Sequence, residues 1–152
     1  MQRTMKLVER DGIHAAIISD GRVLILKRMD LPIIRHFITH PGKWYFVTGG
    51  RKNNERHIDA AYREIREETG LLKSNLELLA DEIEVTITDR DKGIYWKNEF
   101  FVFRSNSQKV KLNFENTQCK WLDFQELAEN EDIKEMLVNR DEILAIMMSH
   151  MR

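Results

Sequence analysis

The sequence has few of the residues that constrain a fold covalently or through the backbone. It holds 1 Cys, 2 Pro and 7 Gly in 152 residues. With Cys119 alone, neither an internal disulfide nor a multi-cysteine metal site can form, and such a composition is typical of a reducing compartment. The low glycine and proline content excludes collagen-like chains, and the hydrophobic content excludes a disordered one. We therefore expect a globular, cytoplasmic protein.

The sequence also lacks a surplus of charge of one sign and any long apolar run. Its 24 Lys and Arg against 25 Asp and Glu give a formal net charge of -1, so no general positive field would hold a nucleic-acid polymer or an anionic membrane. No apolar run reaches the roughly 18 residues that span a bilayer, and residues 1–6 lack the apolar stretch of an export signal. We expect no nucleic-acid polymer and no membrane as partners, and an anionic ligand that is bound locally.

The hydrophobic pattern predicts one domain over residues 1–152. Aliphatic and aromatic runs predict strands at 14–19, 22–28, 44–47, 76–89, 93–104 and 120–122. Apolar residues at helical spacing predict helices at 57–69, 124–128 and 133–148, the last with an apolar stripe that includes Met148. Both prolines fall in residues 29–43, a composition that predicts a long loop or a loop with a short helical turn. The length of this segment indicates a lid or a segment that faces the substrate.

The predicted helix at 57–69 carries an unusual density of carboxylates. At about 100° per residue, Glu64, Glu67 and Glu68 fall within an arc of roughly 100°. Like charges three and four residues apart repel one another unless a cation neutralises them. Oxygen ligands alone favour a hard ion, Mg²⁺ or Mn²⁺, over Zn²⁺. The alternative is a solvated acidic face, because such charge runs are common on surface helices.

The spacing of the whole segment favours the metal site. From Gly49 onwards the sequence reads five residues, Glu55, seven residues, Arg63-Glu64-Ile65, one residue, Glu67-Glu68, one residue and Gly70-Leu71. Every fixed position of the signature of the Nudix hydrolase family is matched, and the segment closely resembles that family, whose members are MutT-like. The resemblance implies an α/β fold, namely an α/β/α sandwich with a mixed β-sheet, as a single Nudix domain.

The resemblance also implies an Mg²⁺-dependent hydrolase that cleaves a phosphoric anhydride bond in a nucleotide-like small molecule. Such a substrate is polyanionic, so attack by water needs cations that neutralise its charge. The metal ligands that the resemblance implies are Glu64, Glu67, Glu68 and the backbone carbonyl of Thr48. Arg63 would orient a catalytic carboxylate and Glu55 would tie the loop to the helix, while Gly49 and Gly70 would be structural.

Residues outside this segment resemble one branch of the family, the dATP and dihydroneopterin triphosphate pyrophosphohydrolases. These are Val47-Thr48 before Gly49, Glu115 six residues before Trp121, and Asn139-Arg140. The resemblance implies cleavage of a nucleoside or pterin triphosphate to its monophosphate and pyrophosphate. Two alternatives stay open: a dinucleoside polyphosphate or nucleotide-sugar (ADP-ribose-like) pyrophosphatase, and a catalytically silent module that senses a nucleotide.

Further residues complete the predicted site. The family commonly supplies one more glutamate as a ligand or general base, and we expect Glu115 in that role, with Glu99 as the alternative and Glu64 as a base within the segment. Lys27 and Arg28 are predicted to bind phosphate oxygens and Trp44 to stack on the base, although solvated charges and a core aromatic would look the same. We expect a monomer or a homodimer.

Overall fold

The structure is a computed structural model that describes residues 6–31, 40–89 and 91–151. Its strands form one mixed sheet of seven strands. The strands are β1 (Val8–Ser19), β2 (Arg22–Arg28), β3 (Trp44–Tyr45), β4 (Val47–Gly50), β5 (Leu76–Asp89), β6 (Ile94–Ser105) and β7 (Asn116–Leu122). The helices are α1 (His57–Thr69), the 3-10 helix η1 (Lys73–Asn75), α2 (Phe124–Glu129), α3 (Glu131–Met136) and α4 (Arg140–His150).

The sheet is organised around β1, which pairs with three other strands. Its partner β6 runs parallel, in a register that extends from Val8 opposite Ile94 to Ile18 opposite Arg104. The pairs of β1 with β2 and with β4, of β5 with β6, and of β2 with β3 and with β7 are antiparallel. The strand order is β3-β2-β1-β6-β5, with β4 beside β1 and β7 beside β2. The predicted mixed sheet is confirmed.

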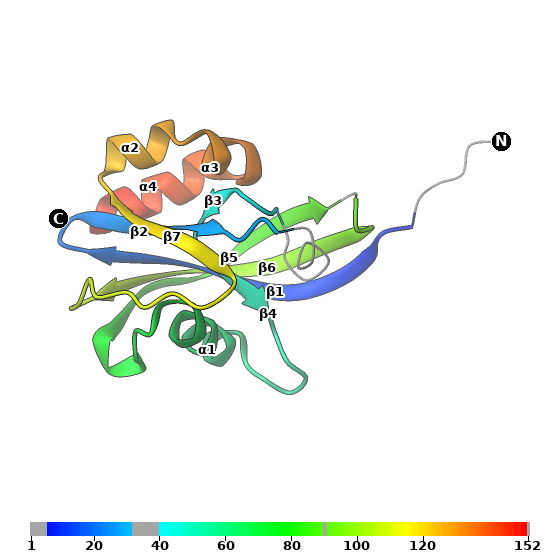
Figure 1. The fold of residues 1–152 in the computed structure, drawn as a ribbon, viewed down its shortest axis with the longest axis horizontal. Coiled ribbons are helices and arrows are strands. Elements are labelled where there is room, and N and C mark those ends of the chain that lie inside the picture. The colour runs from blue at the N-terminus through cyan, green and yellow to red at the C-terminus, as the bar shows by residue number, and fades with distance from the viewer. Residues whose placement is uncertain (1–5, 32–39, 90, 152) are drawn as a thin grey trace.

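The helices cover both faces of the sheet. In Figure 1, α1 lies on one face, and α2, α3 and α4 lie together on the other. Two separate hydrophobic clusters result, because alternate residues of a strand point to opposite faces. One cluster packs Ala61 and Ile65 of α1 against the sheet, and the other packs Ile133, Ile143 and neighbouring residues of the C-terminal helices. The predicted α/β/α sandwich is confirmed.

The helix α1 has the predicted bounds, 57–69, and so do the strands β2 and β5. The helix ends at Gly70, whose φ of 76° lies in the left-handed region that glycine adopts most readily. The N–H of Gly70 donates to the carbonyl of Arg66 at 3.0 Å, which closes the last turn. This end is fixed locally, so the sequence was sufficient to predict it.

Other strand bounds differ from the prediction because pairing extends them. The strand β1 begins at Val8, six residues before the predicted start, since its polar first half pairs with β6. The strand β7 begins at Asn116 rather than 120, since it pairs with β2 as far as Arg28. The strand predicted at 44–47 is divided at Phe46 into β3 and β4, which pair with different neighbours.

The prediction of a single helix at 133–148 is wrong. The helix α3 ends at Met136 and α4 begins at Arg140. Between them, Leu137 takes an extended conformation, and the side-chain amide of Asn139 donates to the carbonyl of Glu84 in β5 at 3.3 Å. Met148, placed in the apolar stripe, is 58% exposed. The break rests on contacts with a distant strand, which helical periodicity does not reveal.

Residues 29–31 and 40–43 have no regular secondary structure, as predicted for that loop, and 32–39 lie outside the described residues. The helix predicted at 124–128 extends to Glu129. None of the helices in the described part of the chain is long and apolar enough to cross a membrane.

Candidate active site

The connection from β4 to α1 brings Gly49 against Glu64. A side chain at Gly49 would overlap the Glu64 carboxylate, so glycine at this position is required for space. Glu64 is only 7% exposed, on the face of α1 that packs toward the sheet. The carboxylate is therefore held at the end of β4, where the two segments cross.

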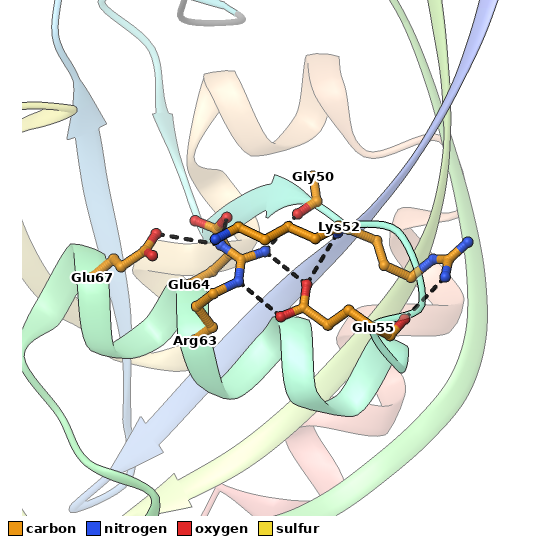
Figure 2. A network of polar contacts seen from close by, with 7 residues as sticks. Gly50, Lys52, Glu55, Arg63, Glu64 and Glu67 are labelled. Carbon is orange, nitrogen blue, oxygen red and sulfur yellow. Dashed lines mark hydrogen bonds and ion pairs between the residues drawn. The ribbon is translucent and has the colours of Figure 1, made fainter.

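Arg63 joins the loop before α1 to the helix. Figure 2 shows its guanidinium between Glu55 and Glu64, with Glu67 on the far side. It donates from Nε and Nη2 to the two Glu55 oxygens, both at 2.9 Å, from Nη2 to the Gly50 carbonyl at 2.8 Å, and from Nη1 to Glu64 Oε1 at 2.8 Å. These hydrogen bonds lower the pKa of Glu55 to about 2 and raise that of Arg63. The loop and the Glu64 carboxylate are thus fixed by one cation.

Three carboxylates converge at this end of α1. Glu64, Glu68 and Glu115 each place an oxygen within 4.8 Å of the others. Glu68 is fully buried one turn after Glu64. Glu115 comes from the turn before β7, and its carbonyl accepts from the N–H of Met29 at 2.8 Å, which anchors the turn to the end of β2. Segments far apart in the sequence therefore build the cluster.

The electrostatics of this cluster favour a bound cation. Burial raises the pKa of Glu64 and of Glu115, and raises that of Glu68 well above its usual value. Asn116 donates to Glu68 Oε1 at 3.0 Å, but Glu68 Oε2 is buried with no hydrogen-bond partner among the described residues. Buried carboxylate oxygens without partners are costly unless a proton or a metal ion neutralises them.

The other predicted metal ligands lie at the margin of this cluster. The Glu67 side chain is 46% exposed and its Oε2 lies 3.4 Å from Arg63 Nη1. Thr48 lines the same cavity as Glu64, and its hydroxyl accepts from Nη1 of the buried Arg28 at 3.0 Å. The described carboxylates that meet within 4.8 Å are therefore Glu64, Glu68 and Glu115, without Glu67.

A cavity of about 230 Å³ opens beside the carboxylates. It is lined by polar and charged side chains, among them Arg28, Thr48, Glu64, Glu115 and Asn98, and by the aromatic and apolar side chains of Tyr45, Ile87, Trp96 and Met136. Of the predicted substrate-binding residues, Arg28 lines the cavity, whereas Lys27 and Trp44 are absent from its described lining. Trp44 lies beside α3, where its backbone N–H donates to the Asp132 carboxylate at 2.9 Å, and its ring contacts the Lys120 ammonium of β7.

His14, which lines the cavity, and Asn116, which contacts the carboxylate cluster, were not predicted for the site from the sequence. His14 is 3% exposed in the middle of β1, and its Nδ1 lies 2.9 Å from the Tyr45 hydroxyl. Burial, with the nearby positive charges of Arg28 and His40, lowers the pKa of His14 to about 3. Asn116, beside Glu115 in the sequence, holds Glu68. The sequence held a signal for each residue. His14 is a polar residue within an aliphatic run, and Asn116 is an amide next to the expected glutamate.

The sequence matches the NUDIX domain family over residues 9–143. The chain belongs to the Nudix family. Glu64, Arg63 and Glu68 therefore lie in the part of the chain that the family shares.

Known Nudix proteins resemble this one in sequence and fold. An RNA pyrophosphohydrolase of Xanthomonas campestris pv. campestris (strain B100) is 31% identical over 97 residues, 53% of this chain and 47% of that protein. The MutT protein of Methanosarcina mazei Go1 superposes with a TM-score of 0.73 at 21% identity, covering 98% of this chain and all of that one. The E. coli dihydroneopterin triphosphate pyrophosphohydrolase superposes with a TM-score of 0.68 at 20% sequence identity, covering 91% of this chain and 98% of that one. This chain spans about half the length of the first relative.

Proposed function

We propose that this Nudix protein is an Mg²⁺-dependent pyrophosphohydrolase, which cleaves a nucleoside or pterin triphosphate to the monophosphate and pyrophosphate. The observation that carries the proposal is the cluster of Glu64, Glu68 and Glu115, of which Glu64 and Glu115 line a cavity. A triphosphate fits this arrangement because its charged end needs cations and its ring needs a partly apolar pocket. Mn²⁺ has the same oxygen-ligand chemistry and is expected to substitute for Mg²⁺.

The metal set in this proposal is Glu64, Glu67, Glu68 and the Thr48 carbonyl, with Glu115 beside Glu64 and Glu68. The bound ions would neutralise the phosphates and lower the pKa of the attacking water. Glu115 is the proposed general base, because it is the least buried carboxylate of the cluster and is reached from the cavity. Arg63 acts as a positioning residue, since it holds Glu64 through one hydrogen bond and the preceding loop through Glu55 and Gly50.

Arg28 is the proposed phosphate ligand. It is 6% exposed, lines the cavity together with Glu64 and Glu115, and donates to Thr48. A guanidinium held in a fixed orientation can donate to phosphate oxygens in parallel, at lower entropic cost than a mobile lysine. Lys27 and Trp44 are kept only as outer contacts of a substrate longer than the cavity.

The test is product analysis on a panel of triphosphates that includes dATP, GTP and dihydroneopterin triphosphate. We expect pyrophosphate as the released product with Mg²⁺ or Mn²⁺, and no turnover with a chelator. Release of orthophosphate, or no hydrolysis of any triphosphate, would contradict the proposal. Diadenosine tetraphosphate and ADP-ribose belong in the same panel, because preference for either would favour the dinucleoside or nucleotide-sugar alternative. Specific binding of nucleotides without turnover would favour a sensing module.

A second candidate substrate is the 5′-triphosphate end of an RNA. The name of the Xanthomonas relative favours it, and the bond to be cleaved would be the same. We favour free triphosphates because the chain has a formal net charge of -1, which provides no overall attraction for a polymer. An RNA chain would have to be bound through local contacts beyond the cavity.

A further inference from the structure

Two buried hydrogen-bond donors in the cavity wall have no partner. Asn98 is 5% exposed and Trp96 is partly buried, and both line the cavity. Asn98 Nδ2 and Trp96 Nε1 are each shielded from solvent, with no hydrogen-bond acceptor among the described residues. Such donors are rare in folded proteins because their desolvation is not compensated. They are the type of group that a bound ligand satisfies.

The sheet places these two side chains together and leaves room for them. Residues 96 and 98 alternate with Lys97 along β6, so they lie on one face. Asn98 is opposite Gly12 of β1, where a side chain would come within 2.7 Å of Asn98 Oδ1 and 3.3 Å of the Trp96 ring. The amide oxygen of Asn98 therefore faces Gly12. A side chain at this position would also come within 2.5 Å of the Gly49 carbonyl oxygen, so the glycine leaves room for the neighbouring backbone as well as for the two side chains.

The position of this wall relative to the carboxylates suggests what it meets. Asn98 and Trp96 belong to the same cavity as Glu64, Glu115 and Arg28. A triphosphate bound at the carboxylates would direct its ring system into the remainder of the cavity. Tyr45 is engaged with His14, whereas Asn98 and Trp96 are the residues of the described lining that carry buried side-chain donors without a partner.

The chemistry of the two groups selects a kind of ring edge. The indole N–H donates only, and the unpaired atom of Asn98 is the amide nitrogen. A 6-oxopurine presents two neighbouring acceptors, O6 and N7, whereas adenine replaces O6 by an amino donor. An adenine ring would therefore place a donor against donors. Pterin rings carry an oxo group as well.

We infer that Asn98, together with Trp96, determines specificity by donating hydrogen bonds to a ring carbonyl of the substrate, so that oxo-substituted rings are preferred to amino-substituted ones. This rests on the proposed function and goes further by naming the ring chemistry. The triphosphates of guanine, hypoxanthine and pterin should therefore have a higher kcat/KM than dATP.

The test compares ITP with ATP, which differ at position 6 of the purine. The wild type should have at least about tenfold higher kcat/KM for ITP, since a site built to bind a polar group rejects the analogue that lacks it. Asn98→Leu should abolish this preference, and Asn98→Asp should reverse it, because a carboxylate accepts from the 6-amino group. Trp96→Phe removes the N–H together with part of the ring and should weaken the preference, which keeps the test valid if both Asn98 variants fail to fold; Trp121→Phe controls for the loss of ring size.

Two matched controls lie outside the cavity. Asn106→Asp changes an exposed asparagine just past the end of β6 and keeps the acceptor that Asn75 uses, and Trp121→Phe changes a tryptophan packed in the other hydrophobic cluster. Both should retain the ratio of the wild type. Equal kcat/KM for ITP and ATP in the wild type, or an unchanged ratio in Asn98→Leu, would overturn the inference.

Calorimetric titration of the metal-free protein with IMP and AMP separates this inference from the proposed function. The wild type should bind IMP at least about tenfold more tightly, and Asn98→Leu should bind the two alike. If no triphosphate is hydrolysed, the proposed function fails while this comparison still tests the ring preference. If triphosphates are hydrolysed but IMP and AMP bind equally, only the ring preference fails.

Discussion

Glu68 is a fully buried ionisable residue. Replacing it with glutamine should therefore lower activity but raise the stability of the metal-free protein. We expect Glu68→Gln to lower kcat by on the order of a hundredfold or more, the scale of losing one charge-stabilising contact in the transition state. The amide can still accept from Asn116, so the fold should persist. Steady-state kinetics at saturating Mg²⁺ measure the effect, and near wild-type turnover would show that Glu68 holds no metal.

The same carboxylate makes the stability of the metal-free protein depend on pH. The pKa of Glu68 is raised in the folded state. The contribution of Glu68 to folding stability is therefore fully present below the pKa of the unfolded chain, near 4.5, and is lost as pH rises through the pKa of the folded protein. In EDTA, Glu68→Gln should therefore melt at a higher temperature than the wild type at pH 8, with a smaller difference at pH 5. Equal melting curves at both pH values would contradict this account.

Glu115 and Glu99 are the two glutamates between which the sequence left a choice. Glu115 belongs to the carboxylate cluster, whereas Glu99 lines a separate groove and accepts from the N–H of Glu82 at 3.4 Å. We predict that Glu115→Gln loses at least about a hundredfold in kcat, as expected for removal of a general base. Glu99→Gln is the matched control and should stay near wild type. Equal or reversed losses would move the base to Glu99 or to Glu64.

His14 gives a pH dependence of opposite sign. Burial lowers the pKa of His14 in the folded protein to about 3, below its ordinary value of 6.5, so its contribution to stability is present above pH 6.5 and is lost as pH falls from there toward 3. His14→Gln keeps a partner for Tyr45 but cannot titrate. Urea unfolding at pH 7 and pH 5 should show the wild type losing more stability than the variant, by up to about 1.4 kcal/mol per pH unit. Parallel losses would show that His14 titrates normally.

At the level of elements, the features that could be predicted from the sequence are those that depend on residues close together in the chain. The bounds of α1 follow from its apolar face and Gly70, and the contacts of Arg63 with Glu55 and Glu64 lie within one short segment. The start of β7, the break between α3 and α4, and the Asn116 contact with Glu68 depend on partners far away in the chain. Periodicity carries no information about such partners, so they could not be predicted.

The junction of β4 and α1 offers a test with adjacent glycines. Gly49→Ala would place a methyl group on the Glu64 carboxylate, whereas at Gly50 the nearest atoms are Trp96 ring carbons at 3.8 Å, an ordinary contact. Overpacking of this kind typically costs about 1–3 kcal/mol. We expect Gly49→Ala to lower both the melting temperature and the affinity for Mg²⁺, and Gly50→Ala to retain most of the stability. Thermal melts and Mg²⁺ titrations of both variants measure this, and similar losses would show that space beside Glu64 is not limiting.

At the level of the whole molecule, the cavity depends on both layers of helices. Glu64 comes from α1 on one face of the sheet, while Met136 comes from α3 on the other. The strand β4 pairs with β1 and is joined to α1 by the loop of residues 51–56, and this connection places Glu64 beside the sheet. The strand order behind this arrangement was available only through family resemblance, since alternation within a strand does not specify its neighbours.

The charge of the whole molecule predicts how the activity responds to the length of an RNA substrate. With a formal net charge of -1, we expect kcat/KM for a 5′-triphosphate oligoribonucleotide to stay at or below that of the mononucleotide with the same base. Phosphate contacts along a chain would raise affinity as nucleotides are added and would make it fall steeply with salt. The measurement is kcat/KM for GTP and for 5′-triphosphorylated RNAs of about two, six and twelve nucleotides beginning with G, at low and moderate salt. A tenfold or larger gain with length, about 1.4 kcal/mol of transition-state binding, would show that the protein has a binding surface for RNA beyond the cavity, and would favour the RNA substrate over the free triphosphate.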